Sequence, residues 1–153
     1  MTNIDGGIMK RFSRKEAERI TGIPARRIQF YTDSDLISMN DKNPGRGRER
    51  LYSKENLIEV LFIKELSLYH IGIPIIKTMM NELRENIGNF FHPDYHRTDQ
   101  YSPNWFLVID HKGMRNVNLH IHPKDKIIKI NMEGYNSALI INVGVLAGKI
   151  EKL

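Results

Sequence analysis

Through the first half of the chain, apolar residues recur every three or four positions, the spacing of one face of an α-helix. Ser13 and Glu16 form a capping box at the start of a first short helix, and Gly22 ends it. Pro24 opens a second helix that runs to about Ser34. Two short helices joined by a brief turn that contains glycine predict a helix-turn-helix.

The segment between residues 38 and 49 is rich in glycine, asparagine, aspartate and proline, which indicates a loop. Residues 50–52 are expected to return as a short strand. A basic hairpin in this place is the wing of a winged-helix domain. Ser53 caps a third, strongly periodic helix, and a fourth helix is expected from about Pro74 to Asn86.

The hydrophobic period changes to two in the last third of the chain, which indicates strands. Four strands are expected, at residues 105–110, 117–122, 127–130 and 138–141. Asn142 is expected to cap a final short helix. The alternative is one helix from Ser137 to the end, which Gly144 and Gly148 weaken.

These elements predict an α+β fold with an N-terminal winged helix-turn-helix domain and a small β-rich C-terminal domain that ends in a short helix. Residues 1–8 are expected to be a flexible tail, and residues 9–88 to form the winged helix-turn-helix domain. Residues 89–104, which carry two prolines, are expected to be a linker. Residues 105–153 are then a small dimerisation or sensor domain.

Charge is unevenly distributed along the 153 residues, whose net charge is +5. Residues 9–54 hold twelve Lys and Arg against six Asp and Glu. This excess suggests a surface for a polyanion such as nucleic acid, and ordinary solvated charge is the plainer alternative. The absence of cysteine excludes disulfides, thiolate zinc sites, iron–sulfur clusters and a cysteine nucleophile. No apolar run suits a signal peptide or a membrane span, so we expect a cytoplasmic, nucleoid-associated protein.

Several motifs of the first half follow one another in a definite order. They are Phe12-Ser13-Arg14-Lys15-Glu16-Ala17, Thr21-Gly22-Ile23-Pro24, Arg26-Arg27-Ile28-Gln29-Phe30-Tyr31, Leu36-Ile37 and Arg50-Leu51-Tyr52-Ser53. In this order and spacing they closely resemble the MerR family of bacterial transcription regulators. The resemblance implies a homodimer that distorts a promoter, with RNA polymerase as a partner.

The chain departs from the family pattern in places. The family usually has Arg-Tyr-Tyr-Glu where this chain has Gln29-Phe30-Tyr31-Thr32, and often glycine where it has Asp35. It normally continues into a long dimerising coiled coil, whereas here the helical pattern ends near Gly88. The absence of cysteine argues against the family's thiolate metal sensors and its iron–sulfur sensor. The resemblance implies nothing specific about residues 89–153.

The candidate DNA-binding residues lie at the start of the first helix, on the second helix and in the wing. They are Ser13, Arg14, Arg26, Arg27, Gln29, Tyr31, Arg46, Arg48, Arg50 and Tyr52. The N-terminal part of the second helix faces the major groove in a helix-turn-helix, where arginine can contact guanine or phosphate. The alternating wing arginines can follow a phosphate track.

Plainer readings stay open for several of these residues. Gln29 can read adenine or simply be exposed. Tyr31 can touch phosphate through its hydroxyl, as the resemblance implies, or pack on the core, with Phe30 as the other ring. Tyr52 more often packs than reaches phosphate. Ser13 can serve as a cap alone.

Histidines and aromatic residues concentrate in the second half. The pairs His92/His96 and His120/His122 have spacings that suit a metal, but Pro93 disfavours a helix at the first pair. The second pair fits the polar face of a strand, so no metal and no cofactor are predicted. An aromatic group near the start of the second domain can line a pocket for a small-molecule effector, or belong to a core or a dimer interface. Its members are Tyr95, Tyr101, Trp105 and Phe106.

The leading functional hypothesis is a sequence-specific DNA-binding transcriptional regulator that acts as a homodimer on a palindromic promoter site. Its expected partners are double-stranded DNA, a second copy of the chain and RNA polymerase, with a small-molecule effector left open. The alternative is a phage-type excisionase or DNA-packaging winged-helix protein without effector-dependent regulation. An enzyme is not predicted, because the chain has no Ser-His-Asp pattern, glycine-rich phosphate loop or His-Glu-x-x-His motif.

Overall fold

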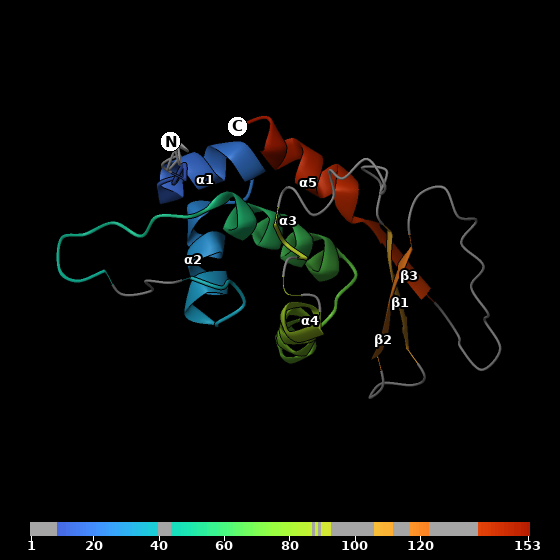
Figure 1. Cartoon of the computed structure of the whole chain (residues 1–153). Helices are drawn as coiled ribbons and strands as arrows, with labels where there is room; N and C mark the ends of the chain where they lie inside the picture. Colours follow the sequence, from blue (N-terminus) through green and yellow to red (C-terminus); the bar gives the residue numbers. More distant parts are fainter. Residues whose placement is uncertain are drawn as a thin grey trace, which may run out of the picture.

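The computed structural model describes residues 9–39, 44–86, 88, 90–92, 106–111, 117–122 and 138–153. In chain order the elements are α1 (Arg14–Thr21), α2 (Ala25–Asp33), α3 (Lys54–Leu68), α4 (Ile73–Asn86), β1 (Phe106–His111), β2 (Val117–His122), β3 (Ala138–Asn142) and α5 (Val143–Glu151). Helix α3 lies at the centre, with α5 on one side and α4 on the other (Figure 1). The three strands lie at the end of the molecule opposite α2 and the segment 44–53 (Figure 1).

The four N-terminal helices confirm the sequence prediction, and those helix ends that were predicted lie within about a residue of the observed ones. Ser13 and Glu16 form the expected capping box, and Gly22 ends α1 in the left-handed conformation with a φ of 68°. Pro24 is the N-cap of α2 and not its first helical residue. Ser53 caps α3 through a second reciprocal pair of hydrogen bonds, in this case with Asn56.

The strand expected at residues 50–52 is reduced to a single antiparallel bridge between Tyr52 and Phe12. The two backbones exchange hydrogen bonds of 2.8 and 2.7 Å, so the end of the segment is fastened to the residue before the α1 cap. The chain upstream turns sharply at Gly45 and Gly47, whose φ angles of 91° and 83° interrupt extended backbone. Arg46, Arg48 and Arg50 therefore alternate along the sequence but do not lie on a strand.

Helix α3 is buried on almost every side, which its periodic pattern did not indicate. The core residues that it contributes are Leu57, Ile58, Val60, Leu61, Phe62, Ile63 and Leu66. Helix α5 packs directly against α3 and adds Val143, Leu146, Ala147 and Ile150 to the same core. Two domains divided at residues 89–104 remain a prediction, but the terminal helix packs on the N-terminal helices and does not keep to a core of its own.

The sheet has the strand order β2-β1-β3, and β1 pairs with both neighbours in antiparallel fashion. Leu107 of β1 stands opposite Ile121 of β2 and Ile141 of β3. Three of the expected strands are thus present, and the one expected at residues 127–130 lies outside the described residues. So do the expected tail at residues 1–8 and most of the expected linker.

The alternative of one helix from residue 137 to the end is wrong, because residues 138–142 form β3. Asn142 begins α5 as expected, since its side chain accepts a hydrogen bond of 3.1 Å from the Val145 N–H. At the other end of α5, the carbonyl of Leu153 accepts a hydrogen bond of 2.7 Å from Lys10 Nζ. The last residues therefore lie beside the start of the helix-turn-helix.

Among the helices in the described part of the chain, none is both long enough and apolar enough to cross a membrane.

Candidate nucleic-acid interface

The turn between α1 and α2 is closed by Thr21. Its hydroxyl donates to the Ala17 carbonyl at 2.7 Å and accepts from the Ile23 N–H at 3.2 Å. Gly22 supplies the left-handed backbone that the turn needs, and Ile23 is buried beneath it. These contacts fix the direction of α2 relative to α1. This direction decides which side chains of α2 can face a DNA groove.

The first turn of α1 is organised by its cap. The Ser13 hydroxyl accepts from the Glu16 N–H at 3.2 Å, and Glu16 Oε2 accepts from the Ser13 N–H at 2.7 Å. The bond from the Ser13 backbone stabilises the carboxylate and lowers the pKa of Glu16. In this structure the described role of Ser13 is that of a cap, and its contact with phosphate stays a prediction.

Helix α2 has one buried face and one outward face. Ile28, Tyr31 and Thr32 are buried, whereas Arg26 and Arg27 are exposed. The two arginines lie in the first turns of the helix with their charges in solvent, as a DNA contact requires. For these two side chains the structure describes no hydrogen bond or ion pair within the described residues, so both are available to a ligand.

Arg14 and Gln29 join α1 to α2 across the outward side. Arg14 Nη1 donates to Gln29 Oε1 at 2.6 Å. A guanidinium can only donate, so the amide oxygen must face Arg14. A bidentate contact of Gln29 with adenine would use the same oxygen. The adenine hypothesis therefore requires that the Arg14 bond be shared or broken.

The two tyrosines among the candidates are both buried. Tyr31 is 2% exposed, so it is the ring that packs on the core, and the neighbouring Phe30 points outward. The Tyr52 hydroxyl lies 3.3 Å from Thr32 Oγ1, inside the domain. The geometry gives both tyrosines a packing role here, and their contact with phosphate stays a prediction.

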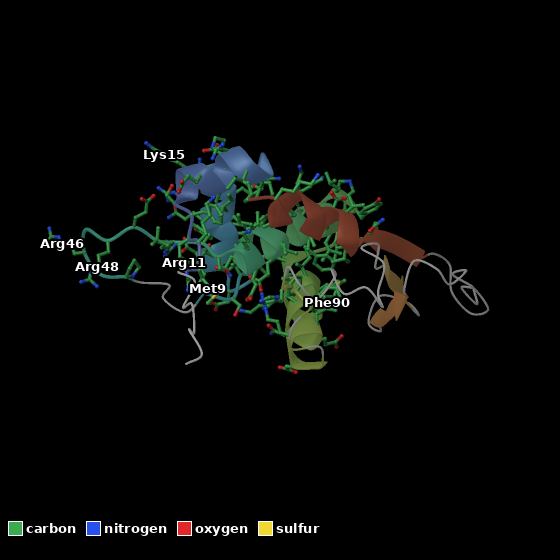
Figure 2. All side chains as sticks on the ribbon, turned by 45° about the horizontal axis from the view of Figure 1, so that its top comes forward. Met9, Arg11, Lys15, Arg46, Arg48 and Phe90 are labelled. Carbon is green, nitrogen blue, oxygen red and sulfur yellow. The ribbon has the colours of Figure 1, made fainter. Side chains whose placement is uncertain are left out.

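The wing arginines divide into two kinds. Arg46 and Arg48 are exposed and extend from the segment 44–53 away from the helices (Figure 2). Arg50 Nη1 instead donates to Asp33 Oδ1 at 2.7 Å, at the end of α2. Arg46 and Arg48 can thus reach a phosphate track beside the protein, while Arg50 ties the wing to α2.

The start of the wing is held by a buried ion pair, Glu59 with Arg84. Glu59 Oε1 accepts from Arg84 Nε at 2.9 Å and from Nη2 at 2.7 Å. Glu59 Oε2 accepts from the Ser38 N–H at 3.0 Å, and Arg84 Nη2 also donates to the Leu36 carbonyl. Burial raises the pKa of Glu59, although Arg84 favours the charged form. Helices α3 and α4 therefore clamp the chain where it leaves α2.

Sequence reasoning missed this ion pair and also missed two exposed cations. Arg11 and Lys15 lie on the same side of the molecule as Arg46 and Arg48 (Figure 2). Arg11 adjoins Phe12, and Lys15 lies beside Arg14 within the motif of residues 12–17, so their positions were the available signal. They widen the basic surface around the start of α1.

The structure describes few of the histidines and aromatic residues that the sequence analysis considered for a metal site or an effector pocket. Of the four histidines considered as metal ligands, only His92 has a described side chain, and it lies 3.7 Å from Glu55. Tyr95, Tyr101 and Trp105 lie outside the described residues, and the side chain of Phe106 is not described. The effector pocket therefore stays a prediction.

Two helices joined by a glycine turn, with two exposed arginines on the outward face of the second helix, define a helix-turn-helix protein. A family model described as MerR HTH family regulatory protein matches residues 12–83, which include α1, α2, α3 and most of α4. Residues 12–83 therefore form a MerR-type helix-turn-helix domain, the kind found in DNA-binding transcription regulators. No curated protein shows significant similarity to the chain.

Proposed function

We propose that this protein is a sequence-specific transcription regulator that binds a palindromic promoter site as a homodimer. The observation that carries the proposal is the exposed pair Arg26 and Arg27 on the outward face of α2, within the segment that the family model matches. Helix α2 would enter the major groove, and Arg46 and Arg48 would contact the flanking phosphates. RNA polymerase is the expected partner at the promoter, and the nucleoid the expected location.

The remaining candidate DNA-binding residues are proposed to have two different roles. Ser13 and Arg14 lie at the start of α1 and Gln29 lies on α2, where phosphate or base contact is expected. Arg50, Tyr31 and Tyr52 would act mainly by holding the wing and α2 in position, since one is ion-paired and two are buried. The same proposal includes two roles for residues 105–153, which would bind a small-molecule effector and join the two copies of the dimer.

Selection of genomic DNA fragments with the purified protein tests the proposal. We expect one enriched motif with two-fold symmetry, located in promoters, and a dimer in sedimentation velocity. The double variant Arg26→Ala/Arg27→Ala should lose the motif while keeping its thermal midpoint. Arg19→Ala/Lys149→Ala, which also removes two exposed cations, is the matched control and should retain the motif.

Three outcomes would contradict the proposal. Unchanged selection by Arg26→Ala/Arg27→Ala would remove α2 as the reading helix. Absence of any enriched motif would remove sequence-specific binding. A motif without two-fold symmetry and away from promoters would favour the excisionase or packaging alternative.

A further inference from the structure

The outward face of α2 contains an aromatic residue in the middle of its charged and polar side chains. Residues three and four apart share a helix face, so Arg26, Gln29, Phe30 and Asp33 form one stripe. The buried residues Ile28, Tyr31 and Thr32 lie on the opposite face. Phe30 is 50% exposed, although phenylalanine is among the residue types most often buried.

Packing within the domain does not account for Phe30. Its described ring contact is with Tyr31, the next residue of the same helix, at 6.1 Å between ring centroids and an interplanar angle of 56°. Tyr31 already supplies the aromatic ring that this helix gives to the core. The exposed half of the Phe30 ring is therefore directed at whatever α2 meets outside the protein.

The polar neighbours of Phe30 on the stripe are held in place by other elements. Arg14 of α1 donates to Gln29 at 2.6 Å, and Arg50 of the wing donates to Asp33 at 2.7 Å. These bonds fix the side chains on either side of the ring. A ring with fixed neighbours has a defined position on the helix surface, which is what recognition of a small apolar group requires.

We propose that Phe30 is a specificity-determining residue that packs against the 5-methyl group of a thymine in the major groove. This inference rests on the proposed function, because it requires α2 to enter that groove. The thymine methyl is the apolar group among the base edges there, and phenylalanine is one of the side chains that contact it. Each half-site then carries a required thymine, close to the bases that Arg26 and Arg27 approach.

Replacement of thymine by deoxyuridine removes this methyl group and leaves every hydrogen-bonding atom of the base in place. In the motif selected by the wild-type protein, each thymine is replaced in turn and the affinity is measured by fluorescence anisotropy. We expect one position per half-site at which deoxyuridine weakens wild-type binding about fourfold, the value for one buried carbon. In Phe30→Ala the thymine and deoxyuridine sites should bind equally at that position.

Two further variants keep the test decisive. Leu51→Ala removes an apolar side chain of similar exposure, 47%, from the wing, and should keep the preference for thymine. Phe30→Gln places a polar helix-forming residue at the same exposed position, and serves in place of Phe30→Ala if that variant has a lowered thermal midpoint.

The outcomes separate this inference from the function on which it rests. A selected motif without a deoxyuridine-sensitive thymine, or with one whose sensitivity persists in both Phe30 variants, would overturn the role of Phe30 alone. A failure of the wild-type protein to select any motif would overturn the proposed function and this inference together.

Discussion

The Arg50 guanidinium lies 2.7 Å from the Asp33 carboxylate, so the wing is joined to the last residue of α2. This ion pair makes Arg50 a positioning residue. Arg50→Ala should weaken DNA binding because the wing loses its place, and adding Asp33→Ala should weaken it little further. The measurement is a double-mutant cycle on the affinity for the selected site. Additive losses would show that the two residues act independently.

Arg46 and Arg48 should behave as phosphate contacts. Each arginine that neutralises one phosphate contributes about 0.9 to the slope of log affinity against log salt concentration. Arg46→Ala and Arg48→Ala should each lower that slope by about this amount and weaken specific and random DNA alike. Lys149→Ala on α5 is the control, an exposed cation outside the proposed interface. An unchanged slope in both wing variants would contradict their role.

Loss of Arg84 should destabilise the protein strongly. Glu59 has a side chain only 3% exposed, and without Arg84 its charge would be buried with no cationic partner described for it. Arg84→Met should lower the free energy of unfolding by about 3 kcal/mol, measured by urea denaturation. Lys77→Met in the same helix breaks an exposed ion pair with Asp35. This variant should change the free energy of unfolding by less than about 1 kcal/mol. Equal losses would mean that the buried pair contributes no more to stability than the exposed pair.

Helix α5 should stabilise the helix-turn-helix through α3. Leu146 is 4% exposed within the shared core, whereas its neighbour Val145 is 48% exposed. Leu146→Ala should therefore lower the free energy of unfolding by about 3 kcal/mol, and Val145→Ala by no more than about 0.5 kcal/mol. Chemical denaturation followed by helical circular dichroism measures both. If Leu146→Ala leaves the N-terminal helices unaffected, α5 is not part of their core.

The capping box of α1 should make stability depend on pH below neutrality. Because the folded-state pKa of Glu16 is lowered from 4.5, the folded protein binds this proton more weakly than the unfolded chain does. The stabilisation is complete well above pH 4.5 and is lost as the pH falls through the lowered pKa. Glu16→Gln should flatten this part of the profile in thermal melts from pH 3 to 7. An identical profile would show that the cap does not titrate.

Local signals were enough to predict the helices, whereas contacts between residues distant in the sequence could not be predicted. Ser13, Gly22 and Ser53 act on their own neighbours, so their types and spacing were enough to place helix ends. Glu59 and Arg84 stand on different helices, and nothing in the local pattern of either helix indicates that they meet. The burial of α3 likewise depends on α5, which arrives from the far end of the chain.

Asp35 shows how a departure from the family pattern is explained by backbone geometry. The family often has glycine there, and the structure gives Asp35 a φ of 59°. This left-handed conformation favours glycine and is tolerated by aspartate. Among the site residues, the exposed arginines were recognisable from the helix-turn-helix pattern. The pairing of Arg50 with Asp33 and the outward turn of Phe30 rather than Tyr31 required the packed structure.

The docking of α5 on α3 has a consequence for the order of events during synthesis. A ribosome makes α1, α2 and α3 long before it makes residues 143–151, yet those last residues supply part of the core around α3. The nascent N-terminal helices must therefore wait with one side of α3 uncovered until residues 143–151 have been made. Closure of the core that supports α2 therefore follows the synthesis of α5 and cannot precede it.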